Sequence, residues 1–341
     1  MHGKKLEHIG NNKNMDLIIK PTQACNFRCD FCSSNNITSN KNILSLDAIY
    51  KILKKYDINT IIVNGGDPLM MPPSYYNSIL NFIESQNKNT TISFTTNLWD
   101  FYKNPDKWKD IFKHPLVGVT TSFQYGNERK LHDGSVFTEN IFCDIINMFK
   151  EYIDYTPMFI SVTTEKNDKY VIDTVKLAKR IGTTCKINPA VMSGRTRKCY
   201  PLWKMYQKYL DIIDAGLEKY EFNSHILKNV INNKHNMCPF SRECWKSIRA
   251  INPDGIIHSC GCYNDDHYNN IKLNKKTYDL CKYDEKELLN DHKALKNECF
   301  ACDLFMLCNS CFKNMDDIIE SNSINEHCYH MKQLEERIKA L

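Results

Sequence analysis

The strongest restriction on the fold of this 341-residue chain is a regular alternation of short apolar segments with amphipathic segments between residues 15 and 189. The apolar segments are rich in β-branched side chains, which suit buried positions on a pleated sheet. Strands that alternate with helices in this way are typical of βα units around a parallel sheet. Six strands are therefore predicted, over residues 16–20, 60–64, 91–95, 117–122, 158–162 and 185–188.

Helices are predicted in the gaps between these strands. Ser45 is expected to cap a helix over residues 46–56, and Asp168 to open one over residues 171–181 that Gly182 ends. A helical stretch over residues 202–220 then leads away from the repeat, and closely spaced cysteines follow Asn232. The prediction is a first domain over residues 1–200, a helical linker over 201–235 and a cysteine-rich second domain over 236–341.

Charge and hydropathy exclude some partners. The 45 basic and 40 acidic side chains give a net charge of +5 without a long block of one sign, so no nucleic-acid partner is predicted. No apolar run is long enough to cross a bilayer, and no targeting segment follows Met1. The protein is therefore expected to be cytoplasmic, with no membrane partner. In that reducing compartment the 16 cysteines are expected to be free thiols or metal ligands.

Three of the cysteines, Cys25, Cys29 and Cys32, lie on one short loop directly after the first predicted strand. A closed site wants four ligands, whereas three thiolates on a four-iron cluster leave one iron open to bind another molecule. The alternatives are a zinc knuckle completed by a distant His or Cys, and buried thiols that are neighbours by chance. The place after a strand favours a reactive site, because reactive groups of barrel-like α/β folds gather on such loops.

The pattern Cys-x3-Cys-x2-Cys resembles the defining motif of the radical S-adenosylmethionine (SAM) superfamily. The resemblance implies an α/β fold with a partial (β/α)6 barrel, similar to part of a TIM barrel. It also implies that Cys25, Cys29 and Cys32 hold a four-iron, four-sulfur (4Fe–4S) cluster, whose open iron chelates the amino and carboxylate groups of SAM. Phe31 stands where the superfamily keeps an aromatic residue against the adenine.

Two later strand ends agree with this resemblance. The second strand runs into Gly65, Gly66 and Asp67, which resemble the superfamily's Gly-Gly-Glu-Pro turn beside the amino group of SAM, with Asp in place of Glu. Taken alone, such a turn is only a tight turn. The fourth strand ends at Ser122, where peptide-modifying relatives show Ser-x-Asp-Gly around the ribose and methionine, although Gln124 replaces the Asp.

Three further polar residues are predicted to point into the barrel. Ser161 and Thr163 lie on the fifth strand and Asn188 on the sixth. Ser161 is also predicted to contact the cofactor.

Eight cysteines of the C-terminal third form a second set, and their number matches two closed four-iron clusters. Their layout resembles the SPASM extension of peptide- and protein-modifying enzymes, whose hairpin is matched over residues 251–257 with a turn at Asp254 and Gly255. The alternative is a pair of zinc-ribbon sites. The resemblance implies an inner auxiliary 4Fe–4S cluster on Cys238, Cys244, Cys260 and Cys311, and an outer one on Cys299, Cys302, Cys308 and Cys328.

Two details of this set matter. Cys308 and Cys311 are separated by two residues, where the family usually has three, which could shift the geometry of the site. Cys262 follows a predicted ligand by two positions and is a candidate catalytic residue, as a hydrogen-atom donor to a substrate radical. The other four cysteines are expected to be ordinary thiols: Cys143, Cys185, Cys199 and Cys281.

The function implied by the resemblance is reductive cleavage of SAM to a 5′-deoxyadenosyl radical, with electrons from a flavodoxin- or ferredoxin-type donor. The SPASM-like segment implies a ribosomally synthesised precursor peptide as substrate, and cross-linking, thioether formation or epimerisation as the reaction. Only 24 residues precede Cys25, so recognition is expected to use a separate leader-peptide-binding protein or the catalytic domains themselves.

Two other functions remain open. Lys20, Pro21 and Thr22 also resemble anaerobic sulfatase-maturating enzymes, but Gly261 stands where those enzymes carry an Asp base. The second is a non-catalytic iron–sulfur protein that carries electrons or scaffolds a partner.

Overall fold

The computed structural model describes residues 13–34, 42–233, 238–241, 244, 247–258, 260–262, 272–274, 297–305 and 307–341. These residues contain a nine-stranded sheet with the order β6-β5-β4-β3-β2-β1-β7-β8-β9. The first six strands pair in parallel: β1 Lys13–Ile19, β2 Asp57–Val63, β3 Thr91–Thr95, β4 Val117–Ser122, β5 Met158–Thr163 and β6 Cys185–Pro189. All six predicted strands are confirmed, although β1 and β2 begin three residues earlier than predicted.

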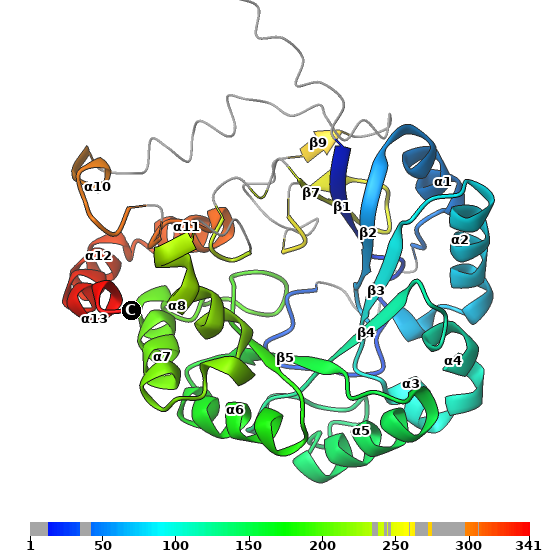
Figure 1. The fold of residues 1–341 in the computed structure, drawn as a ribbon, viewed down its shortest axis with the longest axis horizontal. Helices are drawn as coiled ribbons and strands as arrows, with labels where there is room; N and C mark the ends of the chain where they lie inside the picture. The colour runs from blue at the N-terminus through cyan, green and yellow to red at the C-terminus, as the bar shows by residue number, and fades with distance from the viewer. Residues whose placement is uncertain are drawn as a thin grey trace, which may run out of the picture.

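Helices cover the outer side of the curved sheet, so the fold is the partial (β/α)6 barrel that was predicted (Figure 1). The strands line the inside of the arc and the helices follow one another around it. Their bounds are α1 Leu46–Lys55, α2 Pro73–Ser85, α3 Trp99–Lys103, α4 Pro105–Phe112, α5 Glu139–Ile153 and α6 Val171–Arg180.

The core between sheet and helices is rich in aromatic side chains. Phe94 on β3 packs against Phe112 on α4 with ring centroids 5.5 Å apart, and Phe159 on β5 packs against Phe142 on α5 at 5.2 Å. All four side chains are buried. Because successive strand residues point to opposite faces, Phe159 marks the face of β5 that packs against the helices.

The helix boundaries follow local signals only in part. Ser45 caps α1 as predicted, since its hydroxyl accepts the N–H of Asp47 at 3.2 Å. Gly182 ends α6 with φ +73°, also as predicted. The predicted capping of α6 by Asp168 is wrong: Asp168 begins a 3₁₀ turn over Asp168–Tyr170, and its carboxylate accepts the hydroxyl of Tyr200 at 3.2 Å instead.

The helical stretch predicted over residues 202–220 is interrupted. It consists of α7 Leu202–Asp214 and a 3₁₀ turn over Glu218–Tyr220, before α8 Phe222–Asn233. Between α7 and the 3₁₀ turn, Gly216 has φ +64°, a left-handed conformation that glycine adopts readily and that ends a helix.

The predicted hairpin is confirmed, and the structure extends it into the barrel. Strand β7 Ile248–Ile251 pairs antiparallel with β8 Ile257–His258, which pairs with β9 Lys272–Asn274. Gly255 in the turn has φ +81°. On its other side β7 pairs in parallel with β1, which the sequence did not indicate. The sheet therefore continues from the barrel into the cysteine-rich segment, while the domain limits at residues 200 and 235 stay a prediction.

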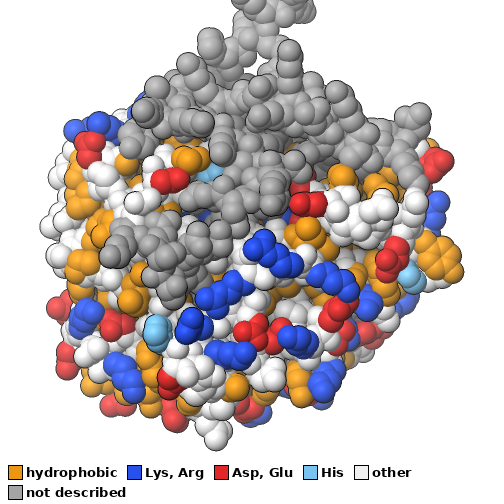
Figure 2. Space-filling view, turned by 180° about the vertical axis from the view of Figure 1, so that it is seen from behind, with side chains coloured by type: hydrophobic (Ala, Val, Ile, Leu, Met, Phe, Trp, Pro, Cys, Tyr) orange, Lys and Arg blue, Asp and Glu red, His pale blue; other side chains and the backbone are white. Residues whose placement is uncertain are grey.

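Four helices complete the described C-terminal residues (Figure 1). They are α10 Asn297–Phe300, α11 Phe312–Glu320, α12 Ile324–Gln333 and α13 Glu335–Lys339, and α12 packs against α7. On the face seen in Figure 2, basic side chains gather near the middle with acidic side chains beside them. None of the helices in the described part of the chain is long and apolar enough to span a membrane.

Candidate active site

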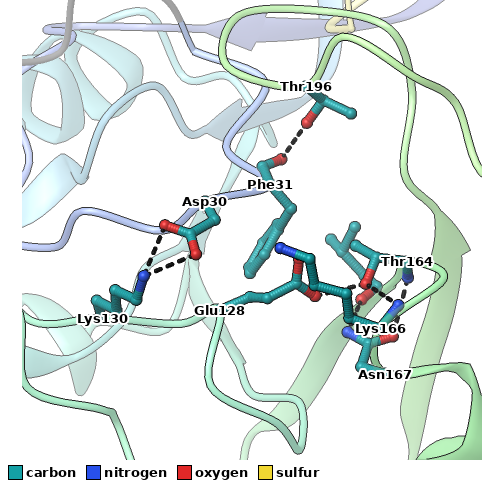
Figure 3. A network of polar contacts seen from close by, with 9 residues as sticks. Asp30, Phe31, Glu128, Lys130, Thr164, Lys166, Asn167 and Thr196 are labelled. Atoms are coloured by element: carbon teal, nitrogen blue, oxygen red, sulfur yellow. Dashed lines mark hydrogen bonds and ion pairs between the residues drawn. The ribbon is translucent and has the colours of Figure 1, made fainter.

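The loop after β1 is held between two other loops. Asp30 donates its backbone N–H to the carbonyl oxygen of Glu128 at 2.9 Å, and Arg195 donates its N–H to the carbonyl oxygen of Cys32 at 2.9 Å. Figure 3 shows Asp30 and Phe31 of this loop beside Glu128 and Thr196. The loop that carries the three-cysteine motif is therefore fixed by the chain segments after β4 and after β6.

A cavity of about 360 Å³ opens beside this loop and is lined by Cys25, Cys29 and Cys32. Its volume lies in the range of small-molecule sites, about 300–1,000 Å³. Burial raises the pKa of the Cys25 thiol well above its ordinary value, and the nearby Asp67 and the other two thiols raise it further. Thiolates crowded in this way are stabilised by bound cations, so the donor set fits an iron–sulfur cluster. Over the described residues, no group of three His, Cys, Asp or Glu side chains forms a site for a single metal ion.

The turn after β2 docks directly on the cysteine loop. Gly66 donates its N–H to the carbonyl oxygen of Thr22 at 3.0 Å. A Cβ atom on Gly66 would lie 2.1 Å from the carbonyl oxygen of Ala24, and one on Gly65 would lie 2.5 Å from that of Thr22. Both glycines line the cavity, but the contact that demands them is with the backbone of the cysteine loop.

Asp67 lines the cavity, yet its carboxylate accepts hydrogen bonds from neighbouring protein groups. It is 2% exposed and accepts the N–H of Asn97 at 2.7 Å, the N–H of Leu69 at 2.9 Å and the hydroxyl of Thr96 at 3.0 Å. Burial raises its pKa to about 6. Asn97 in turn donates to Oδ1 of Asn26 at 2.7 Å, so Asp67 orders the residues behind the cysteine loop.

Arg129 is a site residue that the sequence analysis missed. Its guanidinium donates to Oγ of Ser122 at 3.0 Å and to Oε1 of Gln124 at 3.1 Å, and it lies 5.3 Å from the centre of the Phe31 ring. It is 6% exposed and lines the cavity, and its Nε has no hydrogen-bond partner among the described residues. A lone basic residue outside any motif offered no signal for this position. The cavity thus contains a buried positive charge with neutral partners, which suits an anionic ligand.

Phe31 separates this cavity from a second one of about 240 Å³. Thr164, Ala190 and Tyr200 line the second cavity together with Phe31. In Figure 3 the Phe31 ring points toward Glu128 and Lys166, while its backbone carbonyl accepts the hydroxyl of Thr196.

The predicted orientation of Ser161 and Thr163 is wrong. Both are buried, and both share the face of β5 that carries Phe159, while Val162 lines the cavity. The alternation along β5 therefore turns Ser161 toward the helices, away from a cofactor in the barrel. Asn188 does line the cavity, as predicted.

Cysteines from the C-terminal segment reach the same cavity. Cys238, Cys262 and Cys311 line it together with the first three. Burial raises the pKa of the Cys311 thiol well above its ordinary value, and the nearby Cys238 and Cys244 thiols raise it further. Cys262 donates its N–H to Sγ of Cys260 at 3.4 Å. The four cysteines of the inner set are thus neighbours, and their role as ligands stays a prediction.

Cys262 lines the cavity beside the predicted ligands Cys238 and Cys311. Its contact with the Cys260 thiol lowers its pKa below the ordinary value of a thiol. The position agrees with a thiol that faces a substrate, while the catalytic role of Cys262 stays a prediction.

The outer set surrounds a separate cavity of about 50 Å³, lined by Cys299, Cys302, Cys308 and Cys328. His327 also borders it, and its Nε2 lies 3.3 Å from the carbonyl oxygen of Cys308. The four predicted outer cysteines thus surround one space, and their role as cluster ligands stays a prediction. Cys143, Cys185 and Cys199 line neither cysteine cavity, and Cys281 is outside the described residues.

Comparison with protein families decides the class. The model of the Radical SAM superfamily matches residues 19–199, which is more than half of the chain. The chain belongs to this superfamily. The predicted resemblance and the enzyme class are thereby confirmed, and the cofactors of the superfamily are a 4Fe–4S cluster and SAM.

Individual relatives resemble this radical SAM enzyme over most of its length. A cysteine-type anaerobic sulfatase-maturating enzyme of Clostridium novyi (strain NT) is 22% identical over 357 aligned positions, covering 89% of each chain. The structure of anSMEcpe with bound AdoMet has a TM-score of 0.67 at 15% identity, covering 96% of this chain and 98% of that one. Streptococcus suis SuiB bound to the precursor peptide SuiA has a TM-score of 0.61 at 16% identity, covering 88% and 72%. At these identities the likeness to the solved structures is one of fold.

Proposed function

We propose that this radical SAM enzyme forms a 5′-deoxyadenosyl radical and uses it to modify a ribosomally synthesised precursor peptide. The observation that carries the proposal is one cavity of about 360 Å³ that is lined both by the N-terminal three-cysteine loop and by cysteines of the C-terminal segment. The names of two similar proteins support it, since one is a sulfatase-maturating enzyme and the other is bound to a precursor peptide.

The residues of the cavity fit the two cofactors in separate places. Cys25, Cys29 and Cys32 would hold the 4Fe–4S cluster, and the guanidinium of Arg129 would bind the carboxylate of SAM. Phe31 lies beside Arg129 and also lines the smaller cavity, which supports stacking of the adenine of SAM on its ring. When bound, the cluster and SAM supply the radical, and the protein supplies position and exclusion of water.

The cysteines of the C-terminal segment would hold two auxiliary 4Fe–4S clusters. Cys238 and Cys311 of the inner set line the cavity, so that cluster would receive an electron from a substrate radical, whereas the outer set lines a separate cavity. A flavodoxin- or ferredoxin-type protein would reduce the first cluster. A separate leader-peptide-binding protein is a further proposed partner.

Sulfatase-type protein oxidation is the second candidate, because a similar protein carries that name. The sequence argues against this candidate, because Gly261 stands where those enzymes carry an Asp base, so the chain has no carboxylate at that position. Peptide modification that does not use this base is therefore preferred.

The test is anaerobic reconstitution with iron and sulfide, followed by addition of reductant and SAM. Formation of 5′-deoxyadenosine is expected in the wild type and in Cys143→Ala, whose thiol lines neither cysteine cavity. It is expected to be lost in Cys29→Ala. Absence of the product from the wild type would refute the proposal and leave an electron carrier as the remaining function.

The substrate is tested by coexpression with small peptides encoded beside the gene. Loss of two hydrogen atoms from the peptide indicates a cross-link or an oxidation, and incorporation of deuterium from heavy water without other change indicates epimerisation. Conversion of a sulfatase-derived peptide, with no change in any neighbouring peptide, would favour the second candidate.

A further inference from the structure

Residues 192–196, in the loop after β6, lie directly on the cysteine loop, and we call them the strap. The N–H of Arg195 donates to the carbonyl oxygen of Cys32 at 2.9 Å. The hydroxyl of Ser193 donates to the carbonyl oxygen of Ser33 at 3.1 Å. Gly194 has φ +59°, and a Cβ there would lie 2.5 Å from the carbonyl carbon of Ser33. The approach is so close that only glycine fits.

The other end of the strap is bound to helix α11 by a buried ion pair. Nζ of Lys313 donates to the carbonyl oxygen of Met192 at 3.0 Å, and the N–H of Met192 donates to Oδ2 of Asp317 at 3.0 Å. Lys313 and Asp317 also pair with each other, and their side chains are 1% and 2% exposed. Both backbone polar groups of Met192 are therefore bound by this pair.

Helix α11 also carries a member of the second cysteine set. Cys311 is its N-cap residue, two positions before Lys313. Cys311 and Lys313 line the cavity that the three-cysteine loop lines. A continuous path of backbone and hydrogen bonds thus runs from Cys32 through the strap to helix α11, which Cys311 precedes as the N-cap residue.

The pair is better suited to fixing geometry than to adding stability. A buried ion pair gains little over apolar side chains of the same size, because the desolvation of two charges offsets their attraction. Its hydrogen bonds are directional, however, and here both charged groups also bind one backbone residue. Breaking the pair would release the strap at Met192.

We propose that Lys313 and Asp317 are positioning residues that hold the strap and, through it, set the place of the Cys25–Cys32 loop relative to Cys311. The inference rests on the proposed function for the cluster at that loop. It goes beyond that function by assigning a role to a pair that is separated from the three-cysteine loop by the strap.

The proposal is tested by amide hydrogen exchange on the reconstituted enzyme, in peptides that cover residues 25–34 and 192–196. Asp317→Asn keeps the shape of the side chain and removes its charge. The double variant Lys313→Met, Asp317→Leu removes both charges and guards against misfolding caused by one unpaired charge. Arg337→Gln is the matched control, because Arg337 joins α13 to Asp211 and Asp214 at 3.1 and 2.7 Å, outside the strap.

Both peptides are expected to exchange on the order of tenfold faster or more in the two Asp317 variants, as follows from losing one charge-assisted hydrogen bond. The control is expected to match the wild type. The change that SAM causes in the electron paramagnetic resonance spectrum of the reduced cluster is expected to weaken in the same two variants.

If residues 25–34 exchange at the wild-type rate in folded Asp317 variants, the proposal is overturned. An absence of 5′-deoxyadenosine from the wild type would instead refute the proposed function. In that case the exchange comparison on protein without cofactors still decides whether the pair holds the loop.

Discussion

At the scale of single residues, Arg129 has the environment of a ligand-binding cation. It is 6% exposed, and its hydrogen-bond partners, Ser122 and Gln124, are neutral. A buried charge is costly unless it is paired, so the free-energy gain from an incoming anion is large. In the proposed function that anion is the carboxylate of SAM.

Replacement of Arg129 by Met is expected to weaken SAM binding about 10- to 100-fold, the loss that follows from removing hydrogen bonds to a charged group. Equilibrium binding of SAM to the reconstituted protein checks this. Lys228→Met is the control, because Lys228 pairs with Glu218 at 2.6 Å and neither residue lines the two cavities beside the cysteine loop. Equal affinities for wild type and Arg129→Met would show that SAM binds elsewhere.

Asp67 is expected to make the protein without cofactors less stable as the pH rises from about 4 to about 6. Burial raises its pKa from 3.8 to about 6, so the folded state holds a proton that the unfolded state has released. The protonated Asp67 carboxyl raises the free energy of unfolding by at most about 3 kcal/mol. This contribution is fully present below the pKa of the unfolded chain and is lost as the pH rises through the pKa of the folded protein. Denaturant unfolding of wild type and Asp67→Asn across this range measures the difference. A difference that does not change with pH would contradict the prediction.

At the scale of elements, the site depends on how the ends of neighbouring strands dock on one another. The turn after β2 packs on the loop after β1 at Gly66, and the strap after β6 packs on it at Gly194. At both glycines an added Cβ would meet backbone atoms, so no change of a side-chain rotamer could make room for it.

Replacement of Gly66 by Ala is expected to displace the cysteine loop, because the added Cβ would lie 2.1 Å from the backbone oxygen of Ala24. The free energy of unfolding is expected to fall by about 1–3 kcal/mol, the usual cost of overpacking, and iron bound at the loop to be lost. Gly118→Ala is the control, because no atom lies within 4 Å of its added Cβ. Unfolding curves and iron analysis measure both effects, and full iron content in Gly66→Ala would contradict the argument.

At the scale of the whole molecule, the N-terminal cysteine loop and the cysteine-rich C-terminal segment line one cavity. Strand β7 pairs with β1, which brings the C-terminal segment to the strand that precedes the three-cysteine loop. Cys238 and Cys311 thereby line the same space as Cys25. In the proposed function, this proximity gives a short electron path between the first cluster and the inner auxiliary cluster.

Replacement of Cys311 by Ala is expected to remove about four irons per chain, because each closed cluster needs its complete set of four ligands. The cluster at Cys25, Cys29 and Cys32 is expected to remain and to keep its SAM-dependent spectrum. Iron and sulfide analysis after anaerobic reconstitution measures the change, with Cys143→Ala as control. Tightly bound zinc and little iron in the wild type would favour the zinc-ribbon alternative.

Much of the fold could be predicted because its signals are local. Alternation of apolar segments is enough to locate six strands, and the hairpin at Gly255 is marked by its own turn residues. The cysteine spacing likewise indicated the superfamily, which the match over residues 19–199 confirms. Asp168 was misassigned because a distant hydroxyl, that of Tyr200, binds its carboxylate.

What the sequence by itself determined is therefore the set of elements and the candidate ligands, since periodicity, capping and spacing are properties of neighbouring residues. Only the tertiary structure decided that β7 joins β1, that Val162 and not Ser161 faces the cavity, and that Arg129 is buried beside Phe31. Those outcomes depend on which strand face meets the helices and on contacts between residues far apart in the chain. No local pattern encodes them.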